Sequence, residues 1–341
     1  MNKFSIGVDL GCTNLRIAAV DGHGTLIEKV TLATRLSRGR DHVIAEMCDA
    51  IQSMSDKFKS SAPLQGIGIG VPGIIDVETG LVRDPNLPDW VDYPVHATIE
   101  KRLNTVVIFE NDANVAALGE KWLGAAKDFA DMAMLTLGTG VGGGLVLQGA
   151  LWRGANGMAG EFGHVTVEPE GELCTCGNRG CLELYASATG IVRQAREAIA
   201  SNAASALARS AESDSEFNAK SIFDLAMQGD GDACRIFRFV GRRLGIELAG
   251  LVNSFNLPIY VIGGGVASAW DAFAPSMFEE LRQRSMVYSA TVPHTGIAMA
   301  GQPSSVNVQS RTGRQTIIAR TLLGGDAGLY GAARLPMLNS Q

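Results

Sequence analysis

One histidine and three cysteines that follow it have the side-chain types and the spacing of a metal site. The four residues are His164, Cys174, Cys176 and Cys181. An imidazole and three thiolates suit tetrahedral zinc, and Gly177 and Gly180 would allow a tight knuckle between them. A sphere closed by four protein ligands leaves no place for a catalytic water, so the pattern predicts a structural zinc ion. The alternative is three free thiols and a surface histidine.

Two glutamates flank this group, Glu161 before it and Glu183 after it. Carboxylates that a metal-bound loop holds rigid can accept hydrogen bonds from a polyol at little ordering cost. Two other turns offer acceptors to the same ligand. Gly73 follows a predicted buried strand, and Asn86 lies in a turn braced by prolines on both sides. Taken alone, each of these turns is better explained as an ordinary turn marked by glycine and proline.

Two glycine-rich turns have the composition of phosphate-binding loops. In the first, Asp9 ends a predicted strand and is followed by Gly11 and Thr13; the second is Gly138-Thr139-Gly140. Backbone N–H groups and a hydroxyl in such a turn can bind a phosphate while the carboxylate faces the phosphate's metal ion. An ordinary β-hairpin also explains the first turn. Neither turn is a P-loop or a strand–GxGxxG–helix unit, so the sequence does not support a Rossmann dinucleotide site.

The stretch Glu110-Asn111-Asp112-Ala113-Asn114 stands where a predicted strand ends and a predicted helix begins. Asp112 is well suited to cap a helix over residues 115–123. A cap needs only one acceptor, however, whereas this turn supplies two carboxylates and two amides. A carboxylate at the carboxyl end of a strand could take the proton from a sugar hydroxyl that attacks phosphorus. The two roles are compatible, and the sequence leaves both open.

Short strands that alternate with helices must position these residues. Segments 4–24 and 132–152 share one plan, which predicts a duplicated domain. Each has an apolar run, a glycine turn, a second apolar run and a hairpin signal. Helices are expected over 42–58, 184–208 and 230–252. A buried strand over 259–262 should lead into the turn Gly263-Gly264-Gly265. This alternation is typical of an α/β protein.

Length and composition narrow the class of protein. A chain of 341 residues exceeds what one hydrophobic core usually organises, so two domains are expected. A net charge of −6 without a basic run argues against partners such as nucleic acid or an anionic membrane. Glycines interrupt the least polar segment, 132–147, so it is not a spanning helix. Six cysteines without an export signal indicate the cytoplasm.

Taken together, these residues resemble the ROK family of bacterial sugar kinases, and in particular its glucokinases. The cysteine knuckle with the preceding Glu161-Phe162-Gly163-His164 is the most specific part, and the resemblance runs from Asp9 to Ala333. It implies an actin/hexokinase-like fold of two ribonuclease-H-like α/β domains, with a cleft that closes on sugar and nucleotide. The expected domains are a small one, 1–113 with the C-terminal helix at about 324–341, and a large one, 114–323, which contains the knuckle.

The resemblance also implies a reaction and its residues. The reaction would be transfer of phosphate from ATP, with Mg²⁺, to the 6-hydroxyl of a hexose, glucose being the first expectation. Asp112 would be the general base, and His164 would serve zinc with one ring nitrogen and sugar with the other. The sugar would be bound by Gly73, Asn86, Asn111, Asp112, Glu161, His164 and Glu183. The nucleotide would be bound by Asp9, Gly11, Thr13, Gly138, Thr139, Gly140, Gly263, Gly264 and Gly265. A homodimer or tetramer would be the assembly.

The sequence departs from the family pattern at two places. Cys12 replaces the usual second glycine of the first phosphate loop, where a thiol could crowd the phosphates. The polar stretch 296–315 is longer than expected, and an extended loop or hairpin is predicted for it.

Other functions remain open. The same frame would serve a kinase for N-acetylmannosamine, N-acetylglucosamine, fructose or allose, since a few pocket contacts decide the sugar. A non-catalytic sugar-binding regulator is a further alternative. Asp112 and the two phosphate loops argue against it, because sugar binding alone needs neither. The family's repressors carry an added N-terminal DNA-binding module, whereas Asp9 lies almost at the start of this sequence.

Overall fold

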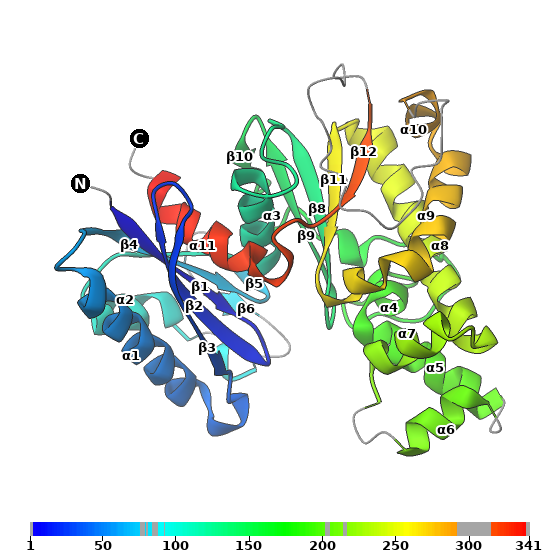
Figure 1. The fold of residues 1–341 in the computed structure, drawn as a ribbon, viewed down its shortest axis with the longest axis horizontal. Helices are drawn as coiled ribbons and strands as arrows, with labels where there is room; N and C mark the ends of the chain where they lie inside the picture. The colour runs from blue at the N-terminus through cyan, green and yellow to red at the C-terminus, as the bar shows by residue number, and fades with distance from the viewer. Residues whose placement is uncertain are drawn as a thin grey trace. The chain divides into compact units, whose positions relative to one another are not determined.

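The computed structural model describes residues 3–75, 79, 81–83, 88–91, 93–201, 205–213, 217–291 and 315–338 (Figure 1). The chain divides into two compact units. Unit 1 comprises Met1–Met134, Gly143–Gly160 and Thr321–Gln341, and unit 2 comprises Leu135–Gly142 and Glu161–Arg320. The domain boundaries expected near residues 113 and 323 stay a prediction.

The first sheet has five strands in the order β3-β2-β1-β4-β7. They are β1 (Phe4–Leu10), β2 (Asn14–Asp21), β3 (Leu26–Ala33), β4 (Leu64–Val71) and β7 (Val107–Asn111). The first three are antiparallel neighbours, whereas β4 is parallel to β1 and β7 is parallel to β4. Asp9 lies opposite Gly70, and Gly70 lies opposite Glu110. The carboxyl ends of three parallel strands therefore meet at one edge of this sheet.

Helices cover both faces of the first sheet. The apolar side chains of β1 at positions 4, 6, 8 and 10 share a core with α1 (Arg40–Phe58) and α2 (Val95–Leu103). The opposite face packs on α11 (Ala327–Leu338), which also contacts α3 (Asp112–Trp122). Gly7 and Gly68 are needed on this face, because a Cβ at either one would collide with the backbone of α11. Strand alternation thus places Asp9 on the side of α11.

The second sheet repeats the plan of the first. Its order is β10-β9-β8-β11-β12, so both sheets run third, second, first, fourth and fifth strand by chain position. The strands are β8 (Met132–Leu137), β9 (Val141–Leu147), β10 (Ala150–Leu151), β11 (Ile259–Gly263) and β12 (Ile317–Arg320). A separate ribbon pairs β5 (Ile74–Ile75) with β6 (Val82–Arg83). The expected α/β class and the expected duplication are confirmed.

In the described part of the chain, seven α-helices of unit 2 follow β10 in the sequence. Five of them come before β11, and two come between β11 and β12. They are α4 (Glu183–Ala186), α5 (Ala188–Ser201), α6 (Ala206–Ser213), α7 (Ala219–Met227), α8 (Gly231–Phe255), α9 (Trp270–Arg284) and α10 (Met286–Thr291). The long helix expected over 230–252 is confirmed as α8. The single helix expected over 184–208 is wrong, because Ser187 has extended backbone angles and separates α4 from α5. This break places the start of α5 beside the glycine turn that follows β8.

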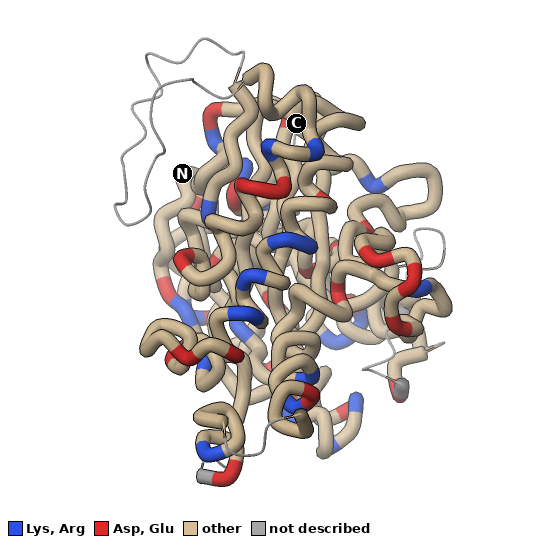
Figure 2. Tube along the Cα trace, turned by 90° about the vertical axis from the view of Figure 1, so that its right-hand side faces the viewer, with Lys and Arg blue, Asp and Glu red and all other residues tan. Residues whose placement is uncertain are grey.

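Charged residues of both signs are interspersed along the trace, as Figure 2 shows, and many of them pair. Within unit 2, for example, Arg243 pairs with Glu168, and Arg242 and Arg284 both pair with Glu280. Among the residues that the structure describes, no helix is both long and apolar enough to cross a membrane.

Candidate functional site

Backbone hydrogen bonds within unit 1 close and support the first glycine turn. The Gly11 N–H donates to the Asn14 carbonyl at 2.9 Å, and the Thr13 carbonyl accepts from the Thr34 N–H at 2.9 Å. The Thr13 residue is exposed. The turn therefore has a fixed backbone and presents its hydroxyl-bearing residue to solvent.

Asp9 stands beside this turn as a buried carboxylate held by a guanidinium. Its Oδ2 lies 2.9 Å from Nη2 of Arg16 on β2. Burial raises the pKa of Asp9, while Arg16 lowers it and the carboxylate of Asp326 raises it further. Arg16 also donates to the carbonyl of Gly325, next to the start of α11. Arg16 thus ties the Asp9 side chain to the C-terminal helix.

The turn between β7 and α3 differs from its prediction, because α3 already begins at Asp112 and not at residue 115. The expected cap, Asp112, is the first helical residue, and Asn111 is the N-cap instead. The Asn111 Oδ1 atom accepts from the N–H groups of Ala113 at 2.9 Å and Asn114 at 3.1 Å. Asn111 takes this place because its backbone is extended, whereas the chain is already helical at Asp112. The N-terminal end of α3 is therefore capped by the side-chain amide of Asn111. The Asp112 carboxylate also accepts from the Ala113 N–H, at 2.8 Å to Oδ1.

Asn111 also joins this turn to the loop after β4. Its Nδ2 donates to the carbonyl of Gly73 at 3.0 Å. Gly73 has a φ of 84°, a conformation that favours glycine and that this turn requires. The sequence predicted both residues, and the structure brings them together within unit 1.

Glu110 lies buried directly before Asn111 and organises the same turn. One oxygen accepts from the Asn111 N–H at 3.0 Å and from Nδ2 of Asn114 at 2.9 Å. The other accepts from Nε of Arg153 at 2.6 Å. All the polar atoms of this network belong to unit 1. Sequence reasoning did not assign Glu110 or Arg153 a role.

The second glycine turn lies in unit 2 between β8 and β9. The Gly138 N–H donates to the Gly140 carbonyl at 2.9 Å and closes the turn. The predicted turn Gly263-Gly264-Gly265 lies close by, since β11 is the neighbour of β8. Gly264 has a φ of 84°, and a Cβ there would collide with the carbonyl of Leu137. Unit 2 thus gathers two glycine turns that lie far apart in the sequence.

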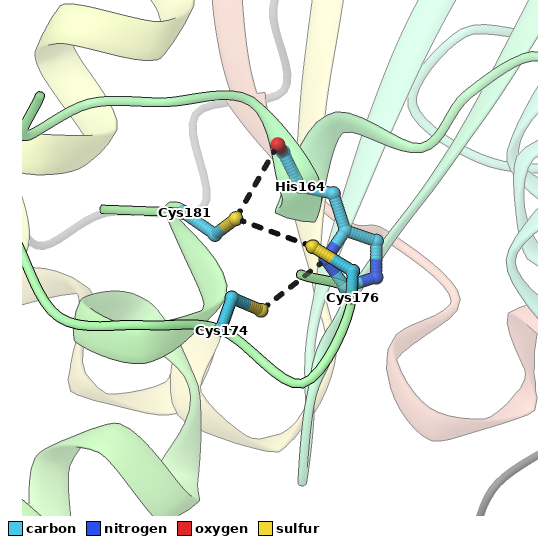
Figure 3. A group of neighbouring side chains, drawn as sticks. All are labelled: His164, Cys174, Cys176 and Cys181. Atoms are coloured by element: carbon cyan, nitrogen blue, oxygen red, sulfur yellow. Dashed lines mark hydrogen bonds between the residues drawn. The ribbon is translucent and has the colours of Figure 1, made fainter. Parts of the chain in front are cut away.

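The four predicted metal ligands come together in unit 2, as Figure 3 shows. Their ligand atoms all lie within 4.8 Å of one another. The sulfurs of Cys176 and Cys181 are 3.7 Å apart, and Cys174 Sγ is 3.7 Å from His164 Nδ1. Two sulfurs bound to one tetrahedral zinc at about 2.3 Å would be separated by about 3.8 Å. The donor set and its spacing therefore fit one tetrahedral ion, and all three cysteines are free thiols.

The geometry of the cluster leaves part of His164 available. Its Nδ1 faces the thiols, so the other ring nitrogen, Nε2, points away from them in Figure 3. The charges of both His164 and Glu183 act on the carboxyl group of Glu161. Partial withdrawal from water raises the pKa of Glu161, His164 lowers it and Glu183 raises it. Glu183 binds the chain itself, because its Oε2 accepts from the Val141 N–H at 2.9 Å.

Each unit thus assembles its own set of predicted residues. Unit 1 holds Asp9, Gly11, Thr13, Gly73, Asn111 and Asp112. Unit 2 holds Gly138, Thr139, Gly140, Glu161, His164, Cys174, Cys176, Cys181, Glu183, Gly263, Gly264 and Gly265. Asn86 and nearly all of the polar stretch 296–315 lie outside the described residues. Sequence reasoning missed three residues that bond to these sets. Arg16 pairs with Asp9, Arg153 with Glu110, and Thr189 donates to the Thr139 carbonyl. They were missed because their partners are distant in the sequence or lie on another strand.

Comparison with known proteins shows the family of this chain. The model of the ROK family matches residues 5–307. A glucokinase from Thermotoga maritima is 40% identical over 331 residues, which are 97% of this chain and 96% of that protein. A xylose repressor from Caldicellulosiruptor bescii is 32% identical over 284 residues, which are 83% of this chain and 71% of that protein.

Solved structures agree with the fold. A ROK family glucokinase from Streptomyces griseus, crystallised with glucose and AMPPNP, matches with a TM-score of 0.75 and 31% identity. The match covers 97% of this chain and 98% of that one. The duplicated sheets accordingly belong to the actin/hexokinase-like fold of ROK kinases. The family model and the relatives together establish that this chain belongs to the ROK family.

Proposed function

We propose that this sugar kinase transfers the terminal phosphoryl group of ATP to the 6-hydroxyl of glucose, with Asp112 as general base. The observation that carries the proposal is the turn after β7. There Asn111 caps α3, and Asp112 stands at the carboxyl edge of the first sheet with its carboxylate not required as the cap. The curated glucokinase relative and the homologous complex with glucose and AMPPNP support the choice of sugar and donor.

The role of Asp112 follows from the chemistry of the attack on phosphorus. A sugar hydroxyl becomes a better nucleophile as a nearby carboxylate takes its proton, and a positioned base typically contributes about 10²- to 10⁴-fold in rate. The network of Glu110, Asn111 and Asn114 fixes the backbone that carries Asp112. We assign Asp112 the proton transfer and this network the positioning of Asp112.

The sugar contacts are assigned to groups whose donors and acceptors suit hydroxyls. In unit 1 these are Asn111, with one amide hydrogen beyond its bond to Gly73, and the backbone of Gly73. In unit 2 they are Glu161, Glu183 and Nε2 of His164. Asn86 stays a prediction on sequence grounds. An array of fixed acceptors costs little ordering when a polyol binds, which favours a sugar over a simple alcohol.

The nucleotide is assigned to the glycine turns. Asp9, Gly11 and Thr13 would face phosphate in unit 1, and Gly138, Thr139 and Gly140 would do so in unit 2, with Gly263 to Gly265 on the adenosine side. Mg²⁺ that enters with ATP would neutralise charge on the phosphates. Asp9 is the carboxylate of this set that suits it, because Asp9 adjoins the first turn and is held in one orientation by Arg16.

The cysteine cluster is assigned a structural zinc ion held by His164, Cys174, Cys176 and Cys181. Its closed set of four ligands leaves no position for substrate, so the ion would fix the loop and take no part in the reaction. His164 would be fixed through Nδ1 and would offer Nε2 to the sugar. The fixed loop includes Glu183, which follows Cys181 by two residues.

A coupled assay for ADP release tests the function. Mg-ATP is offered with glucose, N-acetylmannosamine, N-acetylglucosamine, fructose and allose in parallel. Glucose should give the highest kcat/KM, and Asp112→Asn should lower kcat by about 10²-fold or more. The matched control is Asp128→Asn, an exposed aspartate in the turn after α3, which should leave kcat unchanged. If an N-acetyl sugar is preferred, the sugar assignment is wrong and the base assignment stands.

A sugar-responsive regulator is the second candidate, and the resemblance to xylose repressors is the observation that favours it. The two candidates differ in turnover. If the chain binds glucose but releases no ADP with any sugar, the kinase assignment fails and the regulator takes its place. We place the protein in the cytoplasm as a homodimer or tetramer; gel filtration with light scattering measures the assembly directly.

A further inference from the structure

The second glycine turn is held by hydrogen bonds from one short segment of unit 2, residues 183–189. The Ala188 N–H donates to the Gly138 carbonyl at 2.8 Å, and the Thr189 hydroxyl donates to the Thr139 carbonyl at 2.9 Å. Glu183 accepts from the Val141 N–H at 2.9 Å. The turn is therefore fixed at Gly138, Thr139 and Val141 by a segment that lies 42 to 50 residues further along the chain.

These bonds determine where the N–H groups of the turn point. The C=O and N–H of a trans peptide unit lie on opposite sides of it. Since the carbonyls of Gly138 and Thr139 face the start of α5, the N–H groups of Thr139 and Gly140 are directed away from α5. Neither N–H donates to an acceptor in the part of the chain that the structure describes. Two successive unpaired N–H groups are the arrangement that binds a phosphate oxygen.

Gly140 is needed in this arrangement. A Cβ at this position would overlap Oε2 of Glu183, the atom that accepts from Val141. A side chain there would have to displace the Glu183 carboxylate and break that bond. The Glu183 carboxylate, which packs against the turn, thus explains the glycine.

The segment that holds the turn begins at the cysteine cluster. Glu183 lies two residues after Cys181, and the Leu182 N–H donates to the carbonyl of Val165, next to His164. Ser187 then caps the first turn of α5, since its Oγ accepts from the Gly190 N–H at 2.9 Å. The short chain segment 181–189, with its hydrogen bonds, therefore connects the cluster to the second glycine turn.

We propose that Thr189 is a positioning residue for the nucleotide: with Glu183 and Ala188 it holds the Gly138–Val141 turn so that the N–H groups of Thr139 and Gly140 receive phosphate. This inference rests on the proposed kinase function and adds a residue outside every motif of the sequence. Thr189 does not touch the phosphate itself, because its hydroxyl is used by the Thr139 carbonyl.

The test compares Thr189→Val with Thr189→Ser and Ser201→Ala. Valine keeps the shape of threonine and removes the hydroxyl, whereas serine keeps the donor. Ser201 is the matched control, because it lies on the same helix and its hydroxyl donates to the Glu197 carbonyl at 3.0 Å. Binding of Mg-AMPPNP is measured by calorimetry without turnover, and KM for ATP and for glucose is measured in the coupled assay.

We expect Thr189→Val to raise the Kd for Mg-AMPPNP about three- to tenfold, as loss of one neutral hydrogen bond would. KM for ATP should rise with it, and KM for glucose should not. Thr189→Ser should restore the Kd, and Ser201→Ala should match the wild type. Equal nucleotide affinity in Thr189→Val and wild type would overturn the proposal, as would an equal loss of glucose and nucleotide affinity.

Hydrogen–deuterium exchange of peptides spanning 132–147 separates this proposal from the kinase function on which it rests. In the free protein, Thr189→Val should speed exchange of the Gly138 and Val141 amides, whatever the enzyme phosphorylates. In wild type, Mg-AMPPNP should slow exchange of the Thr139 and Gly140 amides. Faster exchange in the variant without any nucleotide effect shows that the segment holds the turn but that the turn does not receive phosphate. If wild type binds no AMPPNP, the proposed function is wrong and the nucleotide role of Thr189 falls with it.

Discussion

Arg153 donates from Nε to the Oε2 atom of Glu110 at 2.6 Å, and Glu110 is almost completely buried immediately before the turn that carries Asp112. The pair joins the end of β7 to the segment that follows β10. The second Glu110 oxygen is occupied by Asn111 and Asn114. Both oxygens of one carboxylate therefore support the turn in which the proposed base lies.

Glu110→Gln should weaken this turn. An amide offers one acceptor oxygen where the carboxylate offers two, so either the turn or Arg153 loses its partner. Loss of a hydrogen bond to a charged group predicts a fall of about 2 kcal/mol in the free energy of unfolding. We also expect kcat to fall more than KM changes, because Asp112 is displaced while most sugar contacts remain. Urea denaturation and steady-state kinetics measure the two effects.

The control for that variant is Asp224→Asn, which breaks the exposed i,i+4 pair of Lys220 and Asp224. Such surface pairs contribute at most about 1 kcal/mol, and often less than half of that. Identical small changes in both variants would show that Glu110 does not support the turn.

Removal of metal should destabilise unit 2. The purified chain should contain about one zinc ion, released by a strong chelator or on acidification as the thiolates are protonated. Cys174→Ser should lower the zinc content, lower Tm and raise KM for glucose, because His164 and the loop carrying Glu183 lose their anchor. Metal analysis and thermal denaturation provide the measurements.

Cys234→Ser is the matched control, since Cys234 is a free thiol on α8 outside the cluster. It should keep zinc, Tm and KM near the wild-type values. A chain that is purified without zinc under reducing conditions, and whose Tm does not respond to chelator, would leave three free thiols as the correct interpretation.

Local patterns in the sequence predicted the elements and clusters that depend on local spacing. His164 and the three cysteines come together because a short knuckle turned at Gly177 and Gly180 has few other ways to fold. The alternation of β1 and the helical periodicity of α1 and α8 likewise follow from residues three or four positions apart, or two in a strand. The duplication was visible because both copies begin with the same strand–turn–strand plan.

Contacts between distant segments could not be predicted in this way. Thr189 meets Thr139 because two separate structural features, the break at Ser187 and the strand order of the second sheet, place them together. Arg153 and Glu110 lie 43 positions apart. The error at Asp112 has another cause. Asn and Asp are nearly equal as N-caps, so the choice between Asn111 and Asp112 depends on one backbone conformation that the residue types do not determine.

Glu120→Ala should cause a large loss of stability within unit 1. Glu120 is fully buried and accepts from the N–H groups of Ala125, Leu322 and Leu323 and from the Thr321 hydroxyl. Its removal leaves these donors without a partner, at about 1–3 kcal/mol for each that stays buried. We expect a loss of at least about 3 kcal/mol in urea denaturation. Glu197→Ala, at an exposed position on α5, should change stability by less than about 0.5 kcal/mol, and an equal effect in both would refute the assignment.

The pH dependence of stability should be governed in part by Glu247 on α8. Burial raises the pKa of Glu247 to about 7, and no described neighbour offsets it by a charge or a hydrogen bond. Its folded pKa therefore lies above its unfolded value. The stability that protonated Glu247 contributes is fully present below its unfolded pKa, and it is lost as pH rises through about 7. Glu247→Gln stays neutral at every pH, so its stability relative to wild type should rise by about 3 kcal/mol between pH 4 and pH 9.

Glu280, buried on the adjacent helix α9, provides a control of opposite sign. Burial raises its pKa, but hydrogen bonds from Arg284 and Arg242 outweigh burial and leave the pKa below its ordinary value. Its carboxylate therefore stabilises the fold above the unfolded pKa, and this contribution is lost as pH falls through the folded pKa. Glu280→Gln should destabilise the protein at pH 8 and less so at pH 4. Urea denaturation of both variants across this range should give slopes of opposite sign, because one buried glutamate is paired with arginines and the other is not.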